Sequence, residues 1–330
     1  MPHSLPSNPV AARLGTAEKA NDAGDEPILA FDVGGTKIAA ALGTSSGAIL
    51  EEVVEPSSPG GEFDAMWETI CALGDRLLGD ALRPGAIGVS IGGPLDAEKG
   101  VIYAPPNLPG WGSVPLRQLL EDYFGLPSYI EHDAKAGALA EWIFGAGQGC
   151  HNLVFLTFGT GLGAGLIVDG RLCRGRGDLG EVGHWRMAAE GPTAYGKAGS
   201  WEAFSSGAGL SRLAEWRYPG HWPANVEAKL LVELARRGDG PAGSVIDEAA
   251  TMLGQGISYL VDLLSPEVVV LGSLAVRAGD LFLPTAQHIV DTECLASNLP
   301  CPVVAAALGE RIGVTAALCA AIYQRRRSPK

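Results

Sequence analysis

Two stretches of the chain repeat the same local pattern: a strand, a glycine-rich turn and two further short strands. The first lies near residues 28–54 and the second near residues 153–173. In each, an apolar run ends at clustered glycines, which is typical of a buried strand followed by a tight turn. This internal echo predicts two related lobes, each starting with a three-stranded antiparallel unit.

Helices and strands alternate through the rest of the 330 residues. Apolar residues recur every three or four positions over 63–77, which predicts a helix with one buried face. Residues 101–112, rich in Pro, Gly and Asn, are expected to form a loop. The alternation predicts an α/β fold with helices on both faces of mixed sheets. Further expected helices span 116–123, 134–144, 201–215, 225–237, 243–264, 279–293 and 311–325, and further strands 86–91, 128–131, 267–271 and 302–306.

Charge and composition limit the partners. A net charge of −13 repels a phosphate backbone, so nucleic acid is not expected as a partner. No run of about 18 apolar residues occurs, so no membrane span is expected. Six scattered cysteines without a CxxC pair or a secretory signal indicate reduced thiols and a cytoplasmic location. Residues 1–26 are expected to form a loosely packed tail.

The first glycine turn carries residues suited to a polyphosphate. Gly34 and Gly35 allow a sharp turn that exposes backbone N–H groups at close range. Thr36 adds a hydroxyl, Lys37 adds a positive charge, and Asp32 at the strand end offers an oxygen ligand for Mg²⁺. The alternative is a tight hairpin with an aspartate in its turn.

The second glycine turn has four glycines within residues 159–165, between two strands. It is neither a P-loop nor a dinucleotide fingerprint, because no GK[ST] occurs and a strand follows it. Taken alone it could be a purely structural turn. One such turn in each repeat favours two phosphate-binding hairpins that face one ligand.

Asp133 follows an expected strand and precedes an expected helix. A carboxylate there suits the acceptance of a hydroxyl proton during phosphoryl transfer. Capping of the helix is the equally simple alternative. Downstream, Glu181, His184 and Glu202 offer polar groups for a sugar, as does the amide of Asn107 in a Gly- and Pro-rich loop. Trp111 is interpreted as a packing residue.

These segments together resemble the ROK family of repressors, open reading frames and sugar kinases. The resemblance implies an actin-like, ribonuclease H-like fold of two lobes with mixed sheets, flanking helices and a cleft between them. It assigns 27–133 and 312–330 to a small lobe and 134–311 to a large one. The matching segments are 32–37, 131–134, 157–165, 180–184 and 268–273, in family order from about residue 27 to 325.

The resemblance implies transfer of the ATP γ-phosphate to a hexose, with Asp133 as the general base. It also implies Mg²⁺ carried with ATP near Asp32, and a homodimer or tetramer. The implied sugar-binding residues are Gly93, Asn107, His132, Asp133, Glu181, His184 and Glu202. The implied nucleotide-binding residues are Asp32, Gly34, Gly35, Thr36, Lys37, Thr160, Gly161 and Gly272.

Three departures from the family pattern carry expectations of their own. The family's zinc-binding cysteines are replaced by Thr193, Tyr195 and Ser200, so no zinc is expected. Tyr195 and Ser200 are instead expected to hold their loop through hydrogen bonds. His132 stands where the family usually has Asn, which leaves the sugar preference open. Ser273 and Leu274 replace glycines on the adenosine side, which leaves the phosphate donor open.

Several readings of the function stay open at this point. Glucose is the first candidate sugar, with mannose, fructose, allose and N-acetylhexosamines as alternatives. ATP is the first candidate donor, with ADP and polyphosphate as alternatives. A non-catalytic sugar-sensing regulator is a different class of function. The short segment before the first strand and the acidic charge argue against a DNA-binding version of it.

Overall fold

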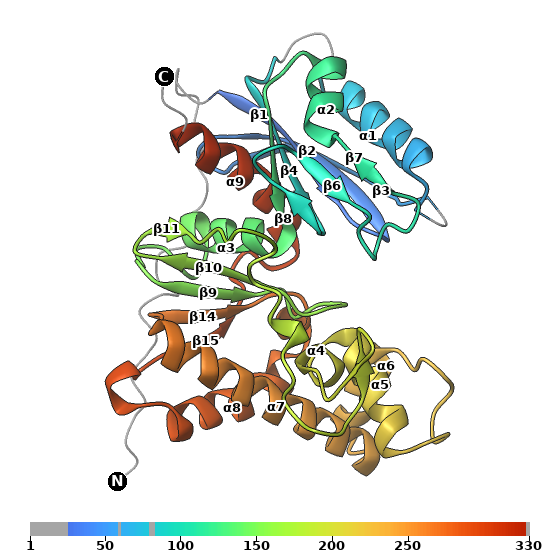
Figure 1. The fold of residues 1–330 in the computed structure, drawn as a ribbon, viewed down its shortest axis with the longest axis vertical. Coiled ribbons are helices and arrows are strands. Elements are labelled where there is room, and N and C mark those ends of the chain that lie inside the picture. The colour runs from blue at the N-terminus through green and yellow to red at the C-terminus, as the bar shows by residue number, and fades with distance from the viewer. Residues whose placement is uncertain (1–25, 59–60, 79–82, 328–330) are drawn as a thin grey trace.

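Residues 26–58, 61–78 and 83–327 are those that the computed structural model describes. Two five-stranded mixed sheets form the framework, one in each half of the molecule (Figure 1). Apart from Glu26, the tail expected over residues 1–26 lies outside the described residues. The two-lobed α/β arrangement expected from the sequence is therefore present.

The first sheet has the strand order β3-β2-β1-β4-β8. β1, β2 and β3 pair antiparallel, and β4 and β8 continue the sheet parallel to β1. The strands are β1 (Pro27–Val33), β2 (Lys37–Thr44), β3 (Ile49–Pro56), β4 (Ala86–Ile91) and β8 (Ser128–His132).

The second sheet repeats this topology, with the order β11-β10-β9-β14-β15. Again three antiparallel strands are extended by two parallel ones. The internal echo seen in the sequence is thus confirmed as a repeated sheet topology. The strands are β9 (Leu153–Leu156), β10 (Ala164–Val168), β11 (Arg171–Leu172), β14 (Val268–Leu271) and β15 (Val303–Ala305).

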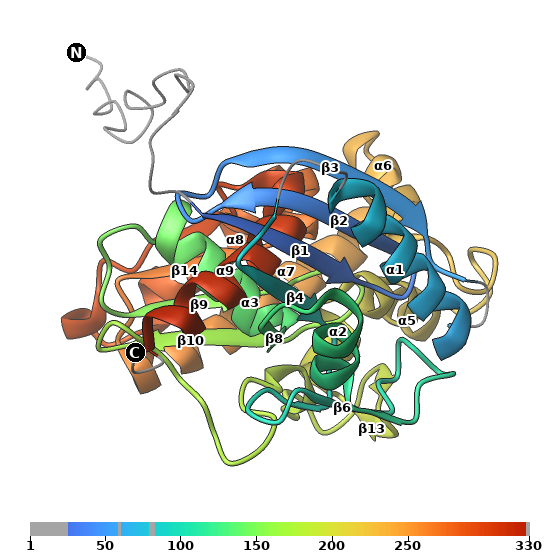
Figure 2. The same ribbon diagram turned by 90° about the horizontal axis from the view of Figure 1, so that it is seen from above.

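Helices α3 (Asp133–Phe144) and α9 (Ile312–Arg327) lie between the two sheets (Figures 1 and 2). Strand β9 shows why the sequence directs helices to both sides of a sheet. Its Leu153 and Phe155 join a core with α3 and α9, whereas Val154 and Leu156 face the core with α7 (Gly240–Leu264) and α8 (Leu274–Glu293). This alternation follows from the two-residue period of a strand.

The outer face of the first sheet is covered by α1 (Phe63–Leu78) and α2 (Leu116–Phe124). Its inner face packs on α9. Trp111 is 1% exposed and packs edge-on against Phe63, so its interpretation as a packing residue is confirmed. Within the described residues, no helix combines the length and apolar character that crossing a membrane requires.

Two expectations about elements were wrong. Residues 101–112 contain a strand, β6 (Val101–Tyr103), which pairs with β5 (Leu95–Asp96) and β7 (Ser113–Val114) in a small sheet. The helix expected over 201–215 is two helices, α4 (Trp201–Phe204) and α5 (Gly207–Arg217). Ser206 separates them because its hydroxyl caps α5 by accepting from Gly209 N–H. The remaining helix in this region is α6 (Ala228–Arg236).

Candidate active site

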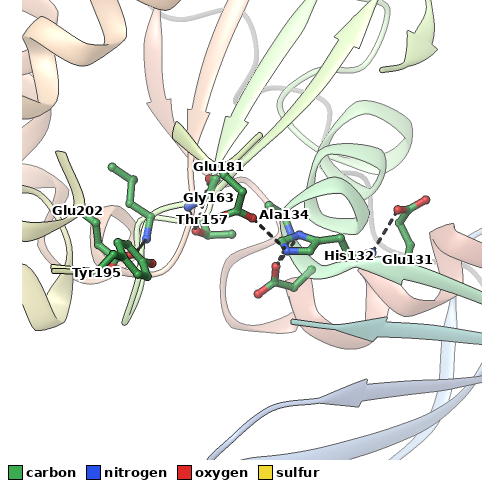
Figure 3. A network of polar contacts seen from close by, with 10 residues as sticks. Glu131, His132, Ala134, Thr157, Gly163, Glu181, Tyr195 and Glu202 are labelled. Carbon is green, nitrogen blue, oxygen red and sulfur yellow. Dashed lines mark hydrogen bonds and ion pairs between the residues drawn. The ribbon is translucent and has the colours of Figure 1, made fainter. Parts of the chain in front are cut away.

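Asp133 is the first residue of α3, directly after β8, and so lies where the two sheets meet. Its Oδ1 accepts a hydrogen bond from Ala134 N–H at 2.6 Å and lies 3.0 Å from His132 Nδ1 (Figure 3). Nδ1 is also 3.3 Å from Ala134 N. With Nδ1 protonated toward Asp133, only the shorter bond from Ala134 persists, because a protonated ring nitrogen cannot accept.

The protonation of this pair follows from its surroundings. Removal from bulk water would by itself raise the pKa of Asp133, although 49% of its side-chain surface remains exposed. The charge and hydrogen bond of His132 outweigh this effect and hold the pKa below its ordinary value. Burial would lower the pKa of His132, but Asp133 and Glu181 raise it above the ordinary value. The pair therefore favours a carboxylate beside an imidazolium.

Glu181 completes a chain of three titratable groups. Its Oε1 lies 3.6 Å from His132 Nε2, and in Figure 3 its side chain points toward the imidazole. Burial raises the pKa of Glu181, and the charges of His132 and His184 partly offset this. Gly93 packs closely against the same ring: a Cβ at this position would come within 2.6 Å of His132 Cδ2. Gly93, His132, Asp133 and Glu181 are therefore brought together.

The neighbouring Glu131 is completely buried and forms an ion pair with Arg174. Its Oε1 also accepts from His132 N–H at 3.1 Å. Arg174 follows β11 of the second sheet, whereas Glu131 belongs to β8 of the first. This ion pair joins the two halves one residue before the His132–Asp133 pair. Arg174 was missed in the sequence, where it is one of three closely spaced arginines and nothing distinguishes it from Arg171 and Arg176.

Asp32 is the second carboxylate at this junction. It accepts a hydrogen bond from Ser90, and its Oδ2 lies against Gly313 in the first turn of α9, where a Cβ would come within 2.1 Å. Burial raises the pKa of Asp32 to about 6; Lys37 acts in the opposite direction and Asp133 adds to the increase. A cation would relieve the repulsion between the two carboxylates, so Asp32 fits the Mg²⁺ that the family implies.

The first glycine turn has an exposed tip formed by Gly35, Thr36 and Lys37. Ser57 braces it, since its hydroxyl donates to Gly34 O at 2.6 Å and its N–H donates to Thr36 O at 3.0 Å. Asn107 lies next to it, because a Cβ on Gly35 would come within 2.6 Å of Asn107 O. Glycine is therefore required at position 35 by this close approach. The Asn107 side chain is exposed.

The second glycine turn is held in place by hydrogen bonds from the N-terminus of α5. Gly159 O and Thr160 O accept from the first amides of α5, Gly207 N–H at 2.7 Å and Ala208 N–H at 3.1 Å. A cavity of about 270 Å³ opens beside this anchor, lined by Gly207, Ala208, Ser211, Arg212, Asn225 and Glu227. Gly272 follows β14 and packs against Thr157 O, where a Cβ would come within 2.8 Å. Thr160 and Gly161 thus lie in the loop between β9 and β10, and Gly272 follows β14 of the same sheet.

Glu202 forms a cluster with the second turn. Its Oε2 accepts from Leu162 N–H at 3.0 Å and from the Tyr195 hydroxyl at 2.5 Å. Figure 3 shows the Glu202 and Tyr195 side chains beside each other. The ring of His184 stacks on Tyr195. The expected hydrogen bond of Tyr195 is confirmed, whereas that of Ser200 was wrong. The buried Ser200 hydroxyl has no hydrogen-bond partner among the described residues.

Within the described parts of the chain, no three His, Cys, Asp or Glu side chains gather in a way that could hold a metal ion. The positions of the family's three zinc-binding cysteines hold Thr193, Tyr195 and Ser200, which are not zinc ligands near neutral pH. The absence of zinc remains a prediction. Asp32 alone would suit Mg²⁺, which keeps most of its waters and shares phosphate ligands.

The family model for the "ROK family" matches residues 28–323, nearly the whole chain. The chain belongs to the ROK family. Curated relatives include a glucokinase of Streptomyces coelicolor, 31% identical over 310 residues that cover 88% of this chain and 95% of the relative. They also include a xylose repressor of Caldicellulosiruptor bescii, 34% identical over 217 residues that cover 62% of this chain and 54% of the repressor. This ROK protein therefore has both kinases and a repressor among its relatives.

Two solved structures share the fold. A ROK hexokinase from Thermus thermophilus has a TM-score of 0.77 and 34% identity, covering 91% of this chain and 99% of the hexokinase. A ROK family glucokinase from Streptomyces griseus, in complex with glucose and AMPPNP, has a TM-score of 0.75 and 30% identity. The match covers 88% of this chain and 98% of the glucokinase. The expected actin-like hexokinase fold is thereby confirmed.

Proposed function

We propose that this ROK protein is an ATP-dependent sugar kinase that transfers the γ-phosphate to a hydroxyl of a hexose, with glucose as the first candidate. The observation that carries the proposal is the Asp133 carboxylate. It lies where the two sheets meet and is kept charged by His132. A glucokinase relative and a solved glucokinase complex with glucose and AMPPNP support the same substrates.

Asp133 would accept the proton of the attacking sugar hydroxyl. Phosphoryl transfer proceeds through a loose transition state, so alignment and charge neutralisation matter more than a strong base. A carboxylate with a lowered pKa suits this role because it is unprotonated at neutral pH. His132, Glu181, His184 and Glu202 would hold the sugar, with Gly93 and Asn107 at its border.

The two glycine turns would hold the triphosphate from opposite sides. Gly34, Gly35, Thr36 and Lys37 would contact it from the first sheet, and Thr160, Gly161 and Gly272 from the second. Asp32 would bind Mg²⁺ through water, and the bound ion would neutralise part of the phosphate charge. We expect the small lobe (27–133 and 312–330) and the large lobe (134–311) to close on the substrates and exclude water.

A panel of sugars against donors tests the proposal. Sugar phosphate is measured by mass spectrometry for glucose, mannose, fructose, allose and N-acetylhexosamines, each with ATP, ADP and polyphosphate. We expect the highest turnover with glucose and ATP in the presence of Mg²⁺. Sugar binding without product from any donor would contradict the kinase proposal and favour the sugar-sensing regulator, the class to which a repressor relative points.

The Asp133→Asn variant tests the base. It should reduce kcat by about 10²–10⁴-fold, because amides do not accept the hydroxyl proton, and leave the sugar dissociation constant within a few-fold of wild type. Calorimetry measures the binding and a coupled assay the turnover. The exposed Asp122→Asn is the matched control, expected to keep wild-type kcat. Near-normal turnover in Asp133→Asn would exclude the role.

A further inference from the structure

Tyr195 occupies a backbone position that a tyrosine disfavours. Strands β12 (Thr193–Ala194) and β13 (Lys197–Ala198) pair antiparallel and are joined by the two-residue loop Tyr195-Gly196. Both loop residues have positive φ, 55° and 67°. Loops of this kind prefer Asn-Gly or Asp-Gly, because a bulky side chain in the left-handed region clashes with its own backbone.

A second hairpin in the same molecule shows the ordinary solution. Asp169-Gly170 joins β10 to β11 with φ values of 50° and 68°, the same loop length and the same left-handed backbone. That hairpin carries the preferred residue pair. Tyr195 therefore adopts a backbone conformation that tyrosine disfavours, and we look to its side-chain contacts for the reason that a tyrosine occupies this position.

The Tyr195 side chain contacts two of the proposed sugar-binding residues at once. Its ring stacks on the imidazole of His184, with centroids 3.9 Å apart and planes inclined by 16°. Its hydroxyl donates to Glu202 Oε2 at 2.5 Å. Burial, and then the hydrogen bond to Glu202, raise the pKa of Tyr195, so the hydroxyl stays protonated and remains a donor. Half of the Tyr195 surface remains exposed to solvent.

These contacts leave Oε1 as the Glu202 oxygen that accepts no hydrogen bond from the described residues. Oε2 accepts from both Tyr195 and Leu162 N–H, which uses its two lone-pair directions. Arg212 forms an ion pair with Oε1 at 3.8 Å, which is beyond hydrogen-bond distance. Oε1 is therefore the atom that remains for a ligand hydroxyl.

The backbone around His184 is held by the same hairpin. Lys197, next to the loop, donates from Nζ to His184 O at 2.7 Å. Arg186 Nη1 donates to Ala198 O at 2.9 Å, and Met187 N–H donates to Gly199 O at 2.8 Å. The hairpin thus fixes the main chain of the 184–187 segment, while Tyr195 fixes the imidazole plane and the carboxylate.

We propose that Tyr195 is a positioning residue for sugar recognition, which orients the His184 imidazole by stacking and limits Glu202 to one acceptor oxygen for a sugar hydroxyl. The inference rests on the proposed sugar kinase function and adds a residue to it. Because the ring and the hydroxyl have separate partners, their roles can be separated by substitution.

Two variants test this. Tyr195→Phe keeps the stack and removes the hydroxyl, and should raise the KM for glucose roughly tenfold, the loss of one hydrogen bond to a charged group. Tyr195→Asn relaxes the loop and removes both contacts. It should raise the glucose KM further while its melting temperature equals or exceeds that of wild type. In both, kcat and the KM for ATP should change much less. Asp169→Asn, in the other hairpin, is the matched control and should leave all values unchanged.

The outcomes distinguish this inference from the proposed function. Wild-type protein without sugar-dependent phosphate transfer would overturn the proposed function and this inference with it. An active wild type whose Tyr195 variants keep the glucose KM would overturn the inference alone. So would variants in which the KM for glucose and ATP rise together with a fall in melting temperature, since a purely structural role predicts that pattern.

Discussion

At the scale of single residues, His132 is the group that sets the charge of its neighbours. It lies between two carboxylates, Asp133 at 3.0 Å and Glu181 at 3.6 Å, and Lys135 is the nearby cation that opposes its protonation. A neutral amide at this position cannot supply the same charge. We therefore expect the catalytic rate and the stability of this chain to depend on pH through His132.

The His132→Asn variant should move the acid limb of the kcat/KM profile to higher pH. Without the imidazolium, the pKa of Asp133 rises back toward its ordinary value, so the base becomes protonated at a higher pH. Rates of sugar phosphorylation measured across acidic and neutral pH check this. The exposed His288→Asn serves as control. Superimposable profiles of wild type and His132→Asn would contradict the prediction.

The same pair has a defined effect on stability. Asp133, with a lowered pKa, stabilises the fold above its unfolded pKa, and this contribution is lost as pH falls through its folded pKa. His132, with a raised pKa, stabilises below its unfolded pKa, and this is lost as pH rises through its folded pKa. The stability difference between wild type and His132→Asn should therefore be largest in weakly acidic solution and shrink toward alkaline pH. Urea denaturation at several pH values measures this difference in unfolding free energy. A difference that does not change with pH would contradict the charge interaction between Asp133 and His132.

Of the two hydrogen bonds predicted for the loop near Glu202, the structure contains one. The hydrogen bond of Tyr195 was predicted, but its stack on His184 was not, because a left-handed tyrosine has no sequence signature. Ser200 was assigned a hydrogen bond that its hydroxyl does not make, because the sequence pattern does not show which way a buried side chain points.

At the scale of elements, Glu141 connects α3 to the segment that leads into α9. It is completely buried, and its carboxylate accepts from three backbone amides: Ala146 at 2.8 Å, Ala307 at 3.1 Å and Leu308 at 3.0 Å. The sequence shows only a glutamate late in an apolar helix. Its partners lie 166 and 167 residues away in two of the three bonds, which no local pattern reveals.

The Glu141→Ala variant should lose about 3–5 kcal/mol of unfolding free energy, since three partly buried N–H groups lose a charged acceptor at about 1–3 kcal/mol each, with partial recovery by water. Glu141→Gln should fall between Ala and wild type, because an amide retains one acceptor oxygen. Denaturation in urea measures both. Glu51→Gln, exposed on β3, is the control for loss of one negative charge. A loss below about 1 kcal/mol in Glu141→Ala would contradict the role.

Strands and long helices were predicted from periodicity, and the differences arise where tertiary contacts override it. The break between α4 and α5 coincides with the amides of Gly207 and Ala208 that bind the second glycine turn. A continuous helix would direct those N–H groups into its own ladder. The small sheet of β5, β6 and β7 includes residues of the segment 101–112, whose Pro and Gly content indicates a loop. Strands of two or three residues are too short for sequence periodicity to predict.

At the scale of the whole molecule, the two sheets repeat one topology, each with a glycine-rich turn after its first strand. The sequence predicted this because the repeat is written twice in the same order of strands and turns. It could not predict which side chains cross between the halves. The Glu131–Arg174 ion pair is one such crossing, adjacent to the proposed catalytic base.

Removing one partner of that pair should be costly. Arg174→Met leaves the Glu131 charge buried without a cation, for which about 3–5 kcal/mol of unfolding free energy is expected. Glu131→Gln leaves a partly exposed arginine and should cost less. The double variant should be more stable than Arg174→Met alone, because no unpaired charge remains. Urea denaturation of the three proteins gives the coupling energy between the two residues.

Because Arg174 precedes the segment that carries Glu181, Arg174→Met should also raise the KM for sugar more than the KM for ATP. Additive stability losses with an unchanged sugar KM would mean that the pair joins the two halves without serving the site.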